Sequence, residues 1–104
     1  MNGEDRLMAS VIEDMHFSHF ADRVGKSFDV TVGGRLLSLV LDAAQELPGS
    51  PRPGGAFRLE FLGPLDPVLE QGIFPFEIDG DRFEIFVVAI ARDANGMRYE
   101  AVFF

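Results

Sequence analysis

Apolar and polar residues alternate through most of the chain from residue 26 onward, and this period of two constrains the fold more than any other feature. It is typical of β-strands with one buried face, because successive side chains of a strand point to opposite sides. Glycine, proline, asparagine and aspartate interrupt the alternation at short intervals, as they do at turns between strands. The pattern predicts about six short antiparallel strands and leaves no long helical period after residue 25.

The dipeptide Gly33-Gly34 sets the register of the first predicted hairpin. Both glycines adopt positive φ at little cost, so together they form a two-residue turn. This turn places Val30 opposite Leu37 and Phe28 opposite Leu39, which makes one face of the hairpin consistently apolar. We therefore expect a strand on each side of this dipeptide.

The dipeptide Asp79-Gly80 predicts a second hairpin in the same way. It pairs Phe76 with Phe83 on one face of the hairpin. On the other face it pairs Glu77 with Arg82, whose charges are opposite. This register is supported because it pairs apolar residues on one face and opposite charges on the other.

A last turn near residues 93–96 leads into the final strand, and the parity of its loop decides which face that strand shows. We expect an odd loop, because the preceding strands already assign the odd-numbered face to the core. This choice places the following residues together on the core face: Val87, Ala89, Tyr99, Ala101 and Phe103. The strands from residue 73 onward then form a meander.

Two other segments complete the predicted fold. Residues 48–55 contain three prolines and three glycines and predict a flexible loop. Residues 57–61 alternate and predict another strand, whereas residues 65–71 predict a single helical turn. The fold class that follows is all-β, with about six short antiparallel strands forming a small barrel or a sandwich.

Residues 1–24 show a helical period instead. Apolar residues recur there at helical spacing: Leu7, Met8, Val11, Ile12 and Met15. A second short helix is predicted over residues 18–24, with Ser18 as its N-cap and Gly25 as the left-handed residue after its end. We expect this segment to cover an open end or a second apolar face of a β domain over residues 25–104. With 104 residues, the chain is expected to be one domain.

Charge and composition exclude several functions. The chain has 17 acidic and nine basic residues, a net charge of −8, and scattered arginines, so we expect no nucleic-acid partner. It has no cysteine and therefore no disulfide or thiolate chemistry. The longest apolar run, residues 85–91, is far shorter than a membrane span of about 20 residues, and the N-terminus lacks a basic start. We expect no membrane partner and a cytoplasmic location.

Few residues offer catalytic or metal-binding chemistry. His16 and His19 lie near Asp14 and Asp22, but two histidines without a third strong ligand rarely form a metal site. No serine lies in a Gly-x-Ser-x-Gly motif, and Gly25-Lys26-Ser27 lacks the upstream glycine of a phosphate-binding loop. We expect no catalytic residue, no cofactor and no metal.

The predicted strand over residues 82–91 is apolar on both faces, whereas a half-exposed strand should alternate. Its odd-numbered residues belong to the core, so its even-numbered residues need another cover. We expect an interaction surface formed by Phe86, Val88, Ile90, Val102 and Phe104. The cover is either the helical front of the chain or another protein chain. We favour self-association or partner docking through the outer face of the last two strands.

Several motifs resemble those of a small uncharacterised bacterial domain family. They are Phe57–Pro64, Leu69–Phe74, Phe86–Val88, Gly96–Phe103 and, near the front, Phe20 with Val24–Phe28. Phe74 and Phe104 depart from the Tyr and Asn that are common in the family. Its members have no assigned activity and tend to be encoded near phage-tail-collar-like proteins. The resemblance therefore implies a role in a tail-derived particle.

Three functions remain open at this point. The first is a non-catalytic structural or protein-interaction module, as an accessory or assembly component of a phage-tail-like particle. The alternative is a small-molecule-binding β-barrel with an interior rich in phenylalanine, of which the chain has 11. The third is an enzyme of unrecognised type. We favour the first, because no catalytic motif is found and functional sites vary independently of fold.

Overall fold

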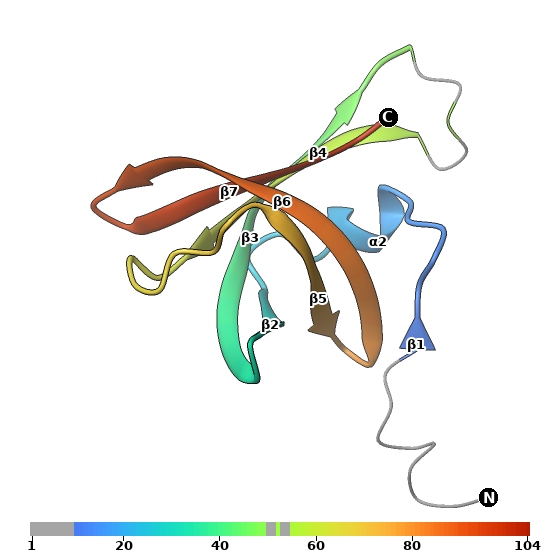
Figure 1. The fold of residues 1–104 in the computed structure, drawn as a ribbon. Helices are drawn as coiled ribbons and strands as arrows, with labels where there is room; N and C mark the ends of the chain where they lie inside the picture. The colour runs from blue at the N-terminus through green and yellow to red at the C-terminus, as the bar shows by residue number, and fades with distance from the viewer. Residues whose placement is uncertain (1–9, 50–51, 53–54) are drawn as a thin grey trace, which may run out of the picture.

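The structure, a computed structural model, describes residues 10–49, 52 and 55–104. Figure 1 shows a small β-barrel with one short helix beside it. The elements are β1 (Ser10–Val11), α2 (Ser18–Ala21), β2 (Ser27–Val32), β3 (Arg35–Leu47), β4 (Ala56–Gly63), β5 (Gly72–Ile78), β6 (Asp81–Asp93) and β7 (Gly96–Phe103). The all-β class predicted from the sequence is confirmed.

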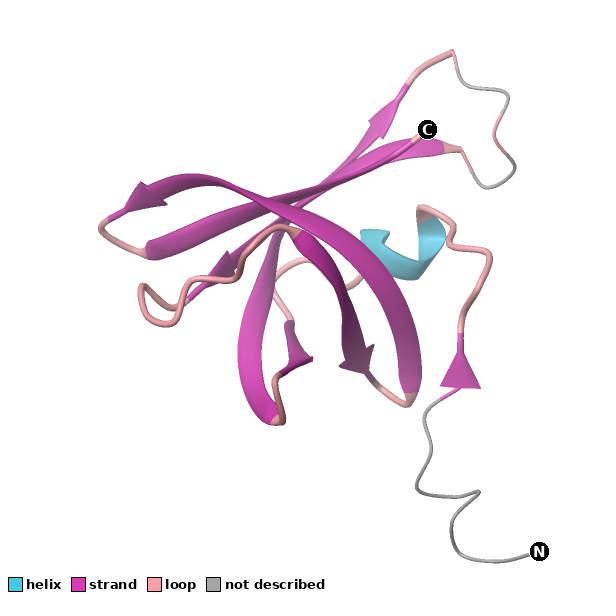
Figure 2. Ribbon diagram, viewed as in Figure 1, coloured by secondary structure: helices cyan, strands magenta, loops and turns pink. Residues whose placement is uncertain are grey.

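Strands β2 to β7 form one antiparallel sheet that closes on itself (Figure 2). The order around the ring is β6-β5-β2-β3-β4-β7, and the pairing of β6 with β7 completes it. Of the two architectures that the sequence left open, the closed ring is a barrel. Strand β1 lies outside the ring and pairs in parallel with the start of β6, where Ser10 is opposite Asp81.

Strands β3 and β6 are each 13 residues long and take part in both halves of the barrel. The first half of β3 pairs with β2 and its second half with β4. The first half of β6 pairs with β5 and its second half with β7. Each strand has a β-bulge near its change of partner, at Asp42 in β3 and at Ile90 in β6. Because a bulge bends a strand and increases its twist, these two strands can curve around the barrel.

The two glycine-containing hairpins have the predicted registers across Gly33-Gly34 and Asp79-Gly80. One detail of the second hairpin differs from the prediction. Glu77 does lie opposite Arg82, but the Arg82 guanidinium donates instead to Glu84 on its own strand, with 2.8 Å between Nε and Oε2. The predicted register of Glu77 and Arg82 is therefore confirmed, but Arg82 forms its ion pair with Glu84.

The last hairpin reaches the predicted core face by a different route. Asp93 lies opposite Gly96, so the loop has two residues and not the odd number that we expected. The bulge at Ile90 then shifts the ladder by one residue and brings Ala89 opposite Tyr99. Tyr99 is buried, so the predicted face is confirmed although the predicted loop parity is wrong.

The ladder between β2 and β5 is the shortest in the ring. It has two residue pairs, Asp29 with Glu77 and Val30 with Phe76. In a two-residue hairpin the two residues that flank the turn form hydrogen bonds with each other, here Ile78 and Asp81. Every second residue of β5 therefore bonds to β6, and the residues between them direct their backbone N–H and C=O groups toward β2. Pro75 is one of these. Pro75 has no N–H to donate, which explains why the ladder does not extend along β5.

The predicted first helix is wrong where the structure describes it. Ser10–Val11 is strand β1, the chain from residue 12 to residue 16 is not helical, and Leu7 and Met8 lie outside the described residues. Ile12 and Met15 pack against the barrel core. Their helical spacing therefore reflects which side chains of an irregular segment face the barrel.

The predicted second helix is confirmed as a single turn over Ser18–Ala21. Phe17 and not Ser18 occupies the N-cap position, and no side chain caps the helix. Gly25 has a φ of 90°, in agreement with the predicted left-handed residue. Helix propensity contributes little at this length, so tertiary contacts must hold the turn in place.

The helical turn predicted for residues 65–71 is wrong. Pro67 disfavours a helical conformation of the residue before it. Leu69 is buried, and its backbone N–H donates to the Tyr99 hydroxyl oxygen at 2.8 Å. This segment is thus held by a hydrogen bond to β7 and not by the internal hydrogen bonds of a helical turn.

Phe20 on α2 closes one end of the barrel. It is fully buried, and its ring centroid lies 4.8 Å from that of Phe83 and 5.7 Å from that of Phe57. Phe28 lies on the other side at 6.2 Å. Aromatic pairs at such spacings stabilise a core beyond the area that they bury. The expectation that the front of the chain covers an open end is therefore confirmed for α2.

Candidate interaction surface

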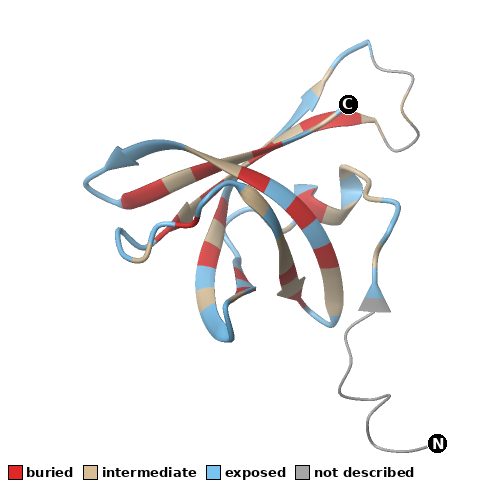
Figure 3. Cartoon of the chain, viewed as in Figure 1, coloured by how far each residue is buried: buried red, intermediate tan, exposed pale blue. Residues whose placement is uncertain are grey.

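Exposed apolar side chains lie next to each other on the outer face of β5 and β6. Phe86 on β6 is opposite Ile73 on β5, and the two side chains are 50% and 65% exposed. Val88 follows on the same face of β6 and is half-buried. Figure 3 shows how buried and exposed residues alternate along the first half of β6. We call Ile73, Phe86 and Val88 the apolar patch.

The first two of the five predicted surface residues, Phe86 and Val88, lie on the same outer face of β6. Ile90 is the bulged, exposed residue of β6. The paired part of β6 and β7 begins with Val88 opposite Glu100, so Val102 on β7 lies beyond it. Val102 and Phe104, which follows β7, are both exposed.

Ile73 belongs to the patch, but the surface predicted from the sequence did not include it. The register of the Asp79-Gly80 hairpin places it directly opposite Phe86, so the same register could have found it. The N-terminal segment does not cover the patch with the side chains that the structure describes, since Ile12 and Met15 pack against the core. The two largest patch residues remain exposed among the described residues.

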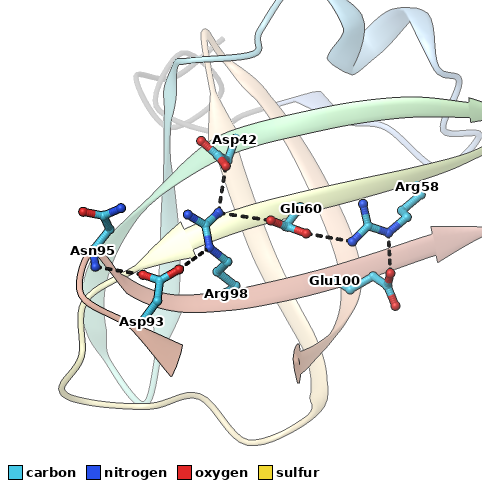
Figure 4. Close-up of polar contacts among 7 residues, drawn as sticks. All are labelled: Asp42, Arg58, Glu60, Asp93, Asn95, Arg98 and Glu100. Carbon is cyan, nitrogen blue, oxygen red and sulfur yellow. Dashed lines mark hydrogen bonds and ion pairs between the residues drawn. The ribbon is translucent and has the colours of Figure 1, made fainter. Parts of the chain in front are cut away.

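An ion-pair network lies beside the patch on β3, β4, β7 and the end of β6 (Figure 4). Arg98 Nη1 is 2.7 Å from Asp42 Oδ2 and 3.0 Å from Glu60 Oε2. Arg98 Nε is 2.7 Å from Asp93 Oδ2, and this contact holds the pKa of Asp93 below its usual range. The Asn95 backbone N–H donates to the same carboxylate and lowers its pKa further. Arg98 thus connects the β3 bulge with β4 and the last hairpin.

Arg58 extends this network along β4. It donates to Glu100 on β7 and, at 2.7 Å, to Glu60 on its own strand. These hydrogen bonds raise the pKa of Arg58, with Glu100 as the larger cause, and the pKa of Arg98 is likewise raised, chiefly by Asp93. Both guanidinium groups are therefore firmly charged and paired. This is the chemistry of a structural cross-link, because neither group can exchange a proton near neutral pH.

The histidines form local contacts. His16 Nε2 lies 3.1 Å from Asp14 Oδ2, and the His16 backbone N–H donates to His19 Nδ1 at 2.9 Å. The His19 ring also packs on Phe83, with 5.6 Å between centroids. Across the described ranges, no three potential metal ligands gather at one place. The same part of the chain has no buried polar or charged residue.

These features define a class of protein: a small closed antiparallel barrel with a packed aromatic core, a charged network on its outer face and an apolar patch beside that network. In the described part of the chain, no helix has the length and hydropathy needed to cross a bilayer.

The chain belongs to the family of domains of unknown function called DUF6916, whose sequence model matches residues 15–103. The match includes most of the segment whose motifs resemble an uncharacterised domain family, and it confirms that part of the resemblance. Neither the curated proteins nor the solved structures include a match to this chain.

Proposed function

We propose that this protein is a non-catalytic structural or protein-interaction module that binds another protein through the apolar patch. The observation that carries this proposal is the exposed pair Ile73 and Phe86, side by side on a regular sheet face. A strand that faces water on its outer side normally has polar residues there, so two large apolar side chains directly opposite each other mark a candidate contact site.

The size of the patch indicates how it would act. Full burial of one such side chain contributes about 1.5–3 kcal/mol, so covering the exposed parts of Ile73 and Phe86 would contribute about 2–3 kcal/mol. This amount is too small to hold a complex together alone. The patch would therefore form the dry centre of a larger interface, with polar and charged contacts around it.

The gene neighbourhood implied by the sequence resemblance supports a more specific role, as an accessory or assembly component of a phage-tail-like particle. Components of such a particle need rigid surfaces that bind each other, and they do not need a catalytic site. A barrel closed on all sides by hydrogen-bonded strands provides such a rigid surface.

The alternative, a small-molecule-binding barrel, has less support from the structure. The phenylalanines that would line its interior contact one another, with centroid distances of 4.7 Å for Phe61 and Phe76 and 5.5 Å for Phe28 and Phe61. A ligand site also needs a few inward-facing polar groups, and the Tyr99 hydroxyl, the buried side-chain polar group among the described residues, already accepts from the Leu69 N–H.

Co-expression with a phage-tail-collar-like protein tests the proposal. The wild-type chain should retain that protein on an affinity column, and Phe86→Glu should lose it. Leu36→Glu is the matched control, because Leu36 is 69% exposed on β3 away from the patch. Both variants should unfold at the wild-type temperature, since both side chains face outward. Retention of the partner by Phe86→Glu would contradict the role of the patch.

A further inference from the structure

Carboxylates border the apolar patch on both sides. Glu84 is two residues from Phe86 along β6, a separation of about 7 Å on the same face. On the other side Glu100 lies opposite Val88, at the start of the β6–β7 ladder. Each of these two carboxylates is paired with an arginine, Glu84 with Arg82 and Glu100 with Arg58, so any excess charge near the patch depends on the remaining carboxylates.

The cations of this outer face are already paired. Arg82 is bound to Glu84, Arg58 to two carboxylates and Arg98 to three. The network of Figure 4 has two guanidinium groups and four carboxylates, so it has excess negative charge even when fully paired. Among the described residues, the arginines of this network and Arg82 are thus all bound to carboxylates.

Asp29 and Glu77 add two more negative charges to the same face. They lie directly opposite each other on β2 and β5, and neither forms an ion pair with a described residue. Like charges in opposed positions of a sheet destabilise it. Glu77 is four residues from Ile73, about 13 Å along β5. A cation placed between the two carboxylates would relieve their repulsion within reach of the patch.

We infer that the partner is a cationic protein surface, one that presents lysine or arginine side chains around an apolar centre. This inference rests on the proposed function and adds the chemistry of the partner. A second copy of the chain fits poorly, because the net charge is −8 and a symmetric contact would bring the same acidic borders together. Charge complementarity of this kind selects a partner and accelerates its association.

Short synthetic peptides test the inference on the full chain. One peptide alternates lysine with leucine, the second has glutamate in place of lysine, and the third has lysine with serine in place of leucine. Binding is followed by the amide shifts of the isotope-labelled protein. The lysine–leucine peptide should bind at least about tenfold more tightly than either of the others, with shifts centred on residues 72–77 and 82–88. Its affinity should fall as NaCl is raised from about 0.02 to about 0.3 M.

Three variants separate the inference from the proposed function. Phe86→Ser should abolish binding of the lysine–leucine peptide, whereas the control Leu36→Ser should bind like the wild type. The double variant Asp29→Asn with Glu77→Gln should fold normally and bind this peptide about three- to tenfold more weakly, because it removes only charge.

The outcomes are distinguishable. If Phe86→Ser abolishes binding but the lysine and glutamate peptides bind equally, the patch is a docking site and the inferred cationic partner is wrong. If Phe86→Ser binds the lysine–leucine peptide like the wild type, the patch is not a docking site and the proposed function fails as well. If no peptide binds the wild-type chain, the inference is also overturned.

Discussion

Phe20 lies where the N-terminal segment meets the barrel, and its ring contacts phenylalanines from β2, β4, β6 and β7. We expect Phe20→Ala to destabilise the protein by about 3–5 kcal/mol, because it leaves a cavity among those rings. Phe20→Leu, which fills most of the space, should be milder and remain folded. Urea unfolding measures both, with Phe104→Ala as a control at an exposed position. A decrease in the free energy of unfolding below about 1 kcal/mol for Phe20→Ala would contradict the role of Phe20 in closing the end of the barrel.

Arg23 holds the α2 segment against the β5–β6 hairpin. Its Nη2 is 2.8 Å from Asp81 Oδ2, its Nε is 3.6 Å from Asp79 Oδ2, and its side chain is largely buried. Removing a charged hydrogen-bond partner from such a site costs about 1–3 kcal/mol. Arg23→Ala should therefore destabilise the protein by this amount in chemical denaturation. The more exposed Arg82→Ala should cost less than about 1 kcal/mol, and equal losses would contradict the assignment.

Asp93 predicts a pH dependence of stability. Its pKa is lowered in the folded state by Arg98 and by the Asn95 backbone N–H, so the folded state binds this proton less readily than the unfolded state. The resulting stabilisation is present above the ordinary aspartate pKa of about 3.9 and is lost as the pH falls through the lower folded value. Arg98→Gln should raise the pKa of Asp93 in a carboxyl NMR titration, and Arg82→Gln should leave it unchanged. An unshifted Asp93 in the wild type would contradict the network.

At the scale of elements, the Asp79-Gly80 turn specifies the β5–β6 hairpin and so the pairing of Ile73 with Phe86. Asp79 and Gly80 have φ values of 51° and 83°, which a β-branched residue adopts only with strain. Gly80→Val should destabilise the protein by about 1–3 kcal/mol, although its side chain would meet open space. Ala94→Val, at a turn position whose own φ is not positive, is the control for thermal melting. An unchanged melting temperature for Gly80→Val would mean that this turn does not set the register.

Local turn chemistry explains which elements were predictable. The dipeptides Gly33-Gly34 and Asp79-Gly80 specify their turns by themselves, so both registers follow from the sequence. The bulges at Asp42 and Ile90 have no such local signal, because they arise where a long strand changes its partner. The closed barrel depends on these bulges, which is why the sequence left barrel and sandwich open.

The candidate surface was predictable only in part for a similar reason. Phe86 and Val88 share one strand, so period-two alternation finds them. Val102 is on another strand, and its distance from the patch depends on where the β6–β7 ladder ends. The opposed pair Asp29 and Glu77 depends on the contact between β2 and β5, which are separated in sequence by two other strands. Such long-range pairings have no local pattern in the chain.

At the scale of the whole molecule, the fold separates stability from binding. The interior is filled by aromatic side chains, and the outer face holds an ion-pair network next to an apolar patch. Changes to the patch should therefore alter binding without unfolding the barrel, because Ile73 and Phe86 add little to the core that they flank. This separation makes the location of the partner measurable.

Hydrogen–deuterium exchange of the chain, alone and in complex with a protein partner isolated by co-expression, tests the location of the interface most directly. We predict that complex formation slows amide exchange by at least about tenfold in residues 72–75 and 84–88 and leaves the exposed hairpin at residues 33–36 unchanged. The patch residues belong to the first two segments, and the hairpin lies outside the patch. Unchanged exchange in residues 72–75 and 84–88, with protection elsewhere or nowhere, would contradict the account.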